Sequence, residues 1–229
     1  KIEVLNAGMD WYTSKHTIIN YTVYARDFQP DIVIVMHGIN DLYRSFSPAT
    51  LAIGEYKSDY THFYGPSING AKPPTFESRI NYVIRKFWYT PTLDPASFDI
   101  SVFKSLKDFR KYMSNIVEIL QNDGAEVILV SQPYFYKTEM STEEEKVLWM
   151  DRGMCILDGK YPNQETMALA MDAYNMSAAA IAAKYKTTFV HGEPAIPKDL
   201  DYFIDDVHFT SLGAKILAEK IAEKIKLRE

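Results

Sequence analysis

Short runs of apolar, mostly β-branched residues recur along the chain, and each is followed by residues that are common in turns. Runs of this length and composition are typical of strands that are buried in a parallel sheet. They predict strands at Ile2–Leu5, Asp31–Met36 and Glu126–Val130, and a more weakly marked strand at Thr187–Val190.

Longer segments repeat apolar residues at intervals of three and four, which is the spacing of one helical face. They predict helices over Thr17–Phe28, Val102–Leu120, Met167–Lys186 and Leu212–Leu227. Because strands and helices alternate, we expect an α/β fold, a three-layer α/β/α sandwich with a mostly parallel sheet and right-handed crossovers.

The middle of the chain departs from this alternation. Residues 43–100 carry several prolines with aromatic residues between them. We interpret this part as an irregular insertion with one helix, at about Glu77–Tyr89, inside a single domain that covers residues 1–229. The length of 229 residues fits one domain with a full hydrophobic core.

Composition and charge narrow the classes of partner. The net charge of -5, without a concentrated basic face, argues against a nucleic-acid partner. No apolar run has the roughly 18 residues that a membrane span requires.

The single Cys155 excludes an intrachain disulfide and a thiolate metal site. We predict no metal, because Asp59 and His62 have no converging third ligand, and we expect no cofactor. The 16 tyrosines are compatible with a large core or with a surface for carbohydrate or aryl esters.

Three polar clusters follow predicted strands or open a predicted helix: residues 6–8, 38–41 and 205–208. In an open parallel sheet, ligands gather beyond the carboxyl ends of the strands, so the three clusters can converge on one edge. Asp205 lies three residues before His208 and can hold its imidazole for proton transfer; the alternative is a helix cap. Gly38 and Asn40 can approach and stabilise an oxyanion, and Gly8 can offer its N–H; the alternative for each is a turn.

Taken together, the clusters resemble those of the SGNH/GDSL family of serine hydrolases. The segment VLNAGMDWYTS resembles the family's second block, VIVMHGINDL its third and FIDDVHFTSLGAKILA its fifth. The resemblance implies a flavodoxin-like parallel sheet of about five strands. It also implies that His208 is the general base, that Asp205 orients it, and that Asn40 and Gly8 form the oxyanion hole. Asp206 is interpreted as solvated and is the reserve choice for the acid.

The resemblance also implies a nucleophilic serine in a first block, which precedes the second block in the family. We therefore expect the nucleophile upstream of Lys1, on a central first strand that is missing from this chain. Ser131 lacks a glycine elbow and Ser67 lies in the irregular insertion, so neither is expected to replace it.

The implied activity is hydrolysis of a carboxylic ester through an acyl-enzyme, with a sugar acetyl ester or a small aryl ester as substrate. An O-acyltransferase that uses the same site, and a non-catalytic binding protein on the same scaffold, are the alternatives. A flavodoxin-like nucleotide binder is disfavoured because the chain has no glycine-rich phosphate loop. The family resemblance weakly favours a secreted or periplasmic location. The sequence itself does not indicate the location of the protein.

Overall fold

The computed structural model describes residues 2–46 and 93–225. The predicted helix at Glu77–Tyr89, Ser67 and the pair Asp59 and His62 lie outside the described residues.

A parallel sheet forms the centre of the molecule, as the sequence predicted. Its strands are β1 (Ile32–Met36), β3 (Glu126–Val130) and β5 (Thr188–Val190), in the order β1-β3-β5. Ile32 is opposite Glu126, and Ile128 is opposite Thr188. β3 lies between the two others and is almost wholly buried, which explains its uninterrupted apolar sequence. A second, smaller parallel pair that the sequence did not predict joins β2 (Asp94–Ala96) to β4 (Lys160–Pro162).

Four of the helices correspond to the predicted ones, with shifted ends. They are α1 (Ser14–Val23), α5 (Ser105–Asn122), α8 (Gln164–Tyr185) and α9 (Ser211–Ala222). The shorter elements are α2 (Ile39–Leu42), α6 (Thr142–Val147), α7 (Met150–Met154), and the 3₁₀ turns η1 (Ala25–Phe28), η2 (Tyr43–Ser45), η5 (Ile100–Val102) and η6 (Glu193–Ala195). In the described part of the chain, no helix is both long enough and apolar enough to cross a membrane.

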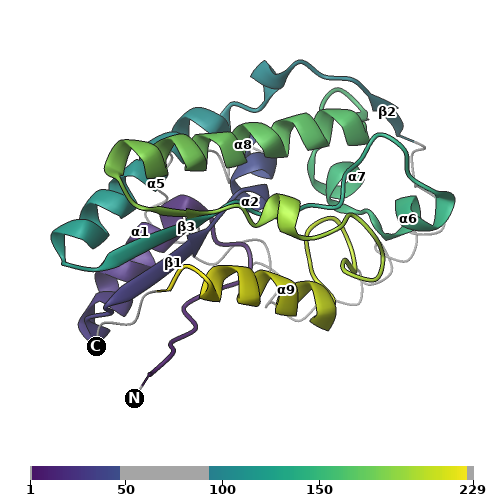
Figure 1. Cartoon of the computed structure of the whole chain (residues 1–229). Helices are drawn as coiled ribbons and strands as arrows, with labels where there is room; N and C mark the ends of the chain where they lie inside the picture. Colours follow the sequence, from purple (N-terminus) through teal and green to yellow (C-terminus); the bar gives the residue numbers. More distant parts are fainter. Residues whose placement is uncertain (1, 47–92, 226–229) are drawn as a thin grey trace, which may run out of the picture.

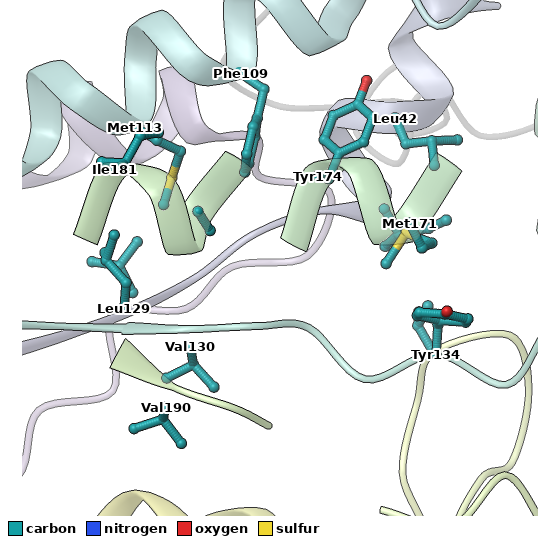
Figure 2. Packing of buried hydrophobic residues seen from close by; sticks show 14 of the residues in the cluster. Leu42, Phe109, Met113, Leu129, Val130, Tyr134, Met171, Tyr174, Ile181 and Val190 are labelled. Atoms are coloured by element: carbon teal, nitrogen blue, oxygen red, sulfur yellow. The ribbon is translucent and has the colours of Figure 1, made fainter. Parts of the chain in front are cut away.

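The helices lie on both faces of the sheet, so the three-layer α/β architecture is confirmed. α5 and α8 lie side by side over one face, and α9 lies on the other (Figure 1). Side chains of α5 and α8 meet those of β3 in the core between the layers (Figure 2). Phe109, Tyr174 and Leu129 are wholly buried there. Burial of each such side chain contributes about 1.5–3 kcal/mol.

The predicted first strand, Ile2–Leu5, is wrong for this structure. Residues 2–8 form an extended segment without strand pairing, and Ile2 and Val4 are 67% and 87% exposed. The physical reason is that a strand needs a neighbour to receive its backbone hydrogen bonds. β1 pairs only with β3, so its other edge has no partner among the described residues.

Candidate active site

The loop before α9 holds the Asp205–His208 pair. The imidazole Nδ1 of His208 lies 2.9 Å from Oδ1 and 2.8 Å from Oδ2 of Asp205. The backbone N–H groups of Val207 and His208 donate to the same Oδ1, at 3.0 Å and 2.9 Å. The carboxylate is therefore fixed by its own loop and in turn fixes the imidazole ring.

The first turn of α9 anchors this loop. Thr210 caps the helix, because its hydroxyl accepts from the N–H of Gly213 at 3.3 Å. The backbone carbonyl of Tyr202 lies only 2.4 Å from where a Cβ on Gly213 would stand. Only glycine allows the loop to approach the helix so closely.

The two side chains shift each other's pKa in opposite directions. Burial raises the pKa of Asp205, but the hydrogen bonds from His208, from the loop backbone and from Trp149 outweigh it and hold the pKa well below its usual range. The hydrogen bond to Asp205 raises the pKa of His208 above its ordinary value, against the effect of burial. The His208 side chain is 56% exposed, and its Nε2 makes no hydrogen bond to the described residues. It is thus open to a reacting group.

The sequence suggested that Asp206 is solvated, but this is wrong: Asp206 is fully buried. Its carboxylate accepts from the hydroxyl of Tyr136 at 2.6 Å, from the N–H of Trp149 at 2.9 Å and from the N–H of Met150 at 3.2 Å. Burial raises its pKa. Asp206 therefore ties the loop to the start of α7. Its hydrogen bonds go to Tyr136, Trp149 and Met150, whereas the imidazole of His208 is hydrogen-bonded to Asp205, so Asp205 and not Asp206 is the candidate acid.

Trp149 is a site residue that the sequence analysis missed. Its indole Nε1 donates to Oδ2 of Asp205 at 3.1 Å. Its ring meets the edge of Trp11 with centroids 6.1 Å apart. No motif includes this residue, and it is far from Asp205 in the sequence; an unexplained tryptophan in a polar segment was the only available signal.

Asn40 lies on α2, directly after β1, and its amide Nδ2 donates to the carbonyl of Tyr12 at 3.0 Å. The neighbouring Asp41 accepts from the backbone N–H and the hydroxyl of Ser14, so it fixes the loop. Burial raises the pKa of Asp41 to about 6, although the bonds from Ser14 oppose this shift. Trp11 precedes Tyr12 and contacts Trp149, so one loop connects Asn40 with the surroundings of Asp205.

Gly8 makes no hydrogen bond to Asn40, Asp205 or His208 in the described residues. Its N–H donates to Oδ1 of Asn6 at 3.0 Å, in the exposed N-terminal segment. A Cβ on Gly38, in contrast, would stand 2.8 Å from Oε1 of Gln132, which also accepts from the N–H of Ile39. Gly38 therefore permits the close packing that directs α2 towards the site.

Three further polar residues near these elements have structural surroundings: His37, His16 and Ser131. His37 is bonded to the hydroxyl of Thr17 at 2.7 Å, and burial lowers its pKa to about 4. His16 and Ser131 are buried. Across residues 2–46 and 93–225, nowhere do three His, Cys, Asp or Glu side chains gather as a metal ion requires.

Solved structures with a similar architecture include acetylxylan esterases. The acetylxylan esterase Axe2 from Geobacillus stearothermophilus aligns with a TM-score of 0.54 and 15% identity, over 98% of this chain and 72% of that one. A catalytic mutant of Axe2 gives a TM-score of 0.56, and a further mutant, described as an acetyl-xylooligosaccharide esterase, gives 0.55; both are 16% identical over the same shares. The TM-scores show a shared fold, and the low sequence identity shows nothing beyond it.

No curated protein matches the sequence significantly. The model of the GDSL-like lipase/acylhydrolase family, however, matches residues 1–216, which is nearly the whole chain. The chain therefore belongs to the GDSL-like lipase/acylhydrolase family and is a GDSL-type carboxylic ester hydrolase.

Proposed function

We propose that the protein hydrolyses a carboxylic ester through an acyl-enzyme, with His208 as general base and Asp205 as the residue that orients it. The observation that carries this proposal is the double contact of His208 Nδ1 with the Asp205 carboxylate, at 2.8 Å and 2.9 Å. This contact fixes the tautomer that leaves Nε2 free to accept a proton. The carboxylate then stabilises the imidazolium that forms.

The nucleophile in this proposal is a serine upstream of Lys1. In the described residues, no serine is hydrogen-bonded to His208, and Ser131 is buried against the carbonyl of Val190. The free edge of β1 supports an additional strand, because its backbone groups have no partner among the described residues and Ile34 is 45% exposed. A strand paired there would end close to α2 and Asn40.

The oxyanion hole in this proposal uses Asn40 and Gly8. The amide of Asn40 has two N–H hydrogens. One donates to the carbonyl of Tyr12, so the second can donate to the oxyanion. The role of Gly8 requires that its N–H leave the side chain of Asn6. The extended, exposed segment around Gly8 presents no packing barrier to that change.

We further propose an acetyl ester of a sugar as the substrate. Structural neighbours of the chain include esterases of acetylxylan and acetyl-xylooligosaccharides. Catalytic mutants of that esterase replace a serine, an aspartate and a histidine, the three residue types that the present mechanism uses. Release of acetate from acetylated xylooligosaccharides, compared with p-nitrophenyl acetate and butyrate, tests this choice.

The mechanism is tested with a fluorophosphonate probe on the full-length protein, followed by mass-spectrometric mapping of the labelled peptide. Labelling of a serine upstream of Lys1, lost in His208→Ala, is the expected result. His191→Ala is the matched control, because His191 is exposed and lies outside the Asp205 loop. It should label like the wild type.

Three outcomes would overturn the proposed function. Labelling that persists in His208→Ala would show that this histidine is not the base. An intact protein with no reactive serine would indicate a binding function on the same scaffold. A labelled enzyme that transfers its acyl group to an alcohol faster than to water would be an O-acyltransferase, and the proposed hydrolysis would be wrong.

A further inference from the structure

Oδ2 of Asp205 has a different set of partners from Oδ1. Oδ1 accepts two backbone N–H groups of its own loop, in addition to the imidazole. Oδ2 accepts the imidazole and the indole N–H of Trp149, and no other donor among the described residues. The plane of the carboxylate is therefore set on one side by the loop and on the other by a residue distant in sequence.

Trp149 is itself held at both ends. Its backbone N–H is bound by the buried carboxylate of Asp206, which also accepts from the following N–H of Met150. Its ring packs edge-on against Trp11, which in turn meets Tyr43 with centroids 5.7 Å apart. Two neighbouring acids thus both accept hydrogen bonds from Trp149: Asp206 from its backbone N–H and Asp205 from its indole N–H.

We propose that Trp149 is a positioning residue for the dyad: its indole N–H fixes the Asp205 carboxylate in the plane that His208 needs. This inference rests on the proposed function for its kinetic consequence. Its structural consequence, a change in the proton affinity of Asp205, is independent of that function. A carboxylate that loses a hydrogen-bond donor is less stable in its ionised form, so its pKa rises.

The test replaces the indole N–H without changing the shape of the ring. In benzothienylalanine, sulfur stands where tryptophan has the N–H, so Trp149→benzothienylalanine keeps the contact with Trp11 and removes only the donor. We expect the pKa of Asp205, followed by carboxyl ¹³C NMR in the full-length protein, to rise. We also expect kcat for ester hydrolysis to fall on the order of tenfold at unchanged KM.

Two further variants make the result specific. Trp11→benzothienylalanine is the matched control, because no hydrogen bond of the Trp11 indole is described and the Asp205 pKa should stay at its wild-type value. Trp149→Phe removes both the donor and the shape, and should lower kcat at least as much as the isosteric analogue.

The outcomes separate this inference from the proposed function. If Trp149→benzothienylalanine has the wild-type Asp205 pKa and the wild-type kcat, Trp149 is only a packing residue and the inference is wrong. If the pKa rises and the wild-type protein has no esterase activity, the positioning contact holds while the proposed function fails. The role of the N–H would also be overturned if kcat fell in Trp149→Phe but not in Trp149→benzothienylalanine.

Discussion

Replacing Asp206 by alanine should destabilise the fold strongly, although this residue is an acid beside the proposed catalytic acid. The carboxylate is fully buried and accepts from Tyr136, Trp149 and Met150. Asp206→Ala leaves these three donors without an acceptor, and each buried donor left unsatisfied costs about 1–3 kcal/mol.

One effect acts in the other direction. Asp151 is also fully buried, and the charge of Asp206 contributes to raising the pKa of Asp151 to about 6, after burial as the main cause. Removing one of two neighbouring carboxylates relieves their repulsion and the cost of burying a charge. We therefore expect a net loss of about 3 kcal/mol, at the low end of what three lost donors predict.

The assay is urea unfolding of the full-length protein at pH 7, followed by circular dichroism. Equal slopes against urea would show that the variant changes the free energy of unfolding and not the unfolded state. Asp201→Ala is the control, because Asp201 lies exposed in the same loop and its side chain makes no described contact; its midpoint should not move.

A loss below about 1 kcal/mol in Asp206→Ala would refute this reasoning. So would an Asp206→Asn variant that is more stable than the wild type. That result would mean that the repulsion from Asp151 exceeds the contribution of the hydrogen bonds, and that Asp206 strains the loop instead of anchoring it.

Four further predictions concern the dyad and its surroundings. Asp205→Asn should lower the pKa of His208, measured by imidazole NMR, because the carboxylate is the main cause of its elevation; an unchanged value would contradict the pairing. In the wild type, kcat/KM should fall as the pH drops through this raised pKa, since protonated His208 cannot act as a base, whereas the pair's contribution to stability is lost as the pH rises through it. Asn40→Ala should lower kcat by about 10²–10³, and steady-state kinetics with unchanged rates would remove Asn40 from the oxyanion hole. Gly213→Ala should destabilise the fold by about 3 kcal/mol in thermal unfolding, because its Cβ would stand 2.4 Å from the Tyr202 carbonyl; Gly153→Ala, with its nearest atom at 3.8 Å, should not.

The sequence was informative wherever a local pattern decides the structure. β3 has the predicted bounds, because a short, β-branched apolar run is typical of a strand that is buried on both faces of a parallel sheet. The spacing of Asp205 and His208 predicted their pairing, since residues three apart in one loop are close enough for the carboxylate to reach the imidazole.

The errors and omissions all involve long-range partners. Ile2–Leu5 has the composition of a strand, but a strand exists only with a neighbour, which the segment itself cannot reveal. Asp205 and Asp206 look alike in sequence, and only the fold turns one towards His208 and the other towards Tyr136. The contact of Trp149 with Asp205 connects segments that no motif relates.

The register of the sheet has a consequence for synthesis of the protein on the ribosome. Ile32 of β1 pairs with Glu126 of β3, which is made much later. At about 5–20 residues per second, β1 emerges several seconds before its partner exists. During that delay the edge of β1 that later pairs with β3 is open, and this apolar strand is exposed to other nascent chains. Production of this protein should therefore depend on chaperones that bind short apolar segments, and slower translation should lower its soluble yield.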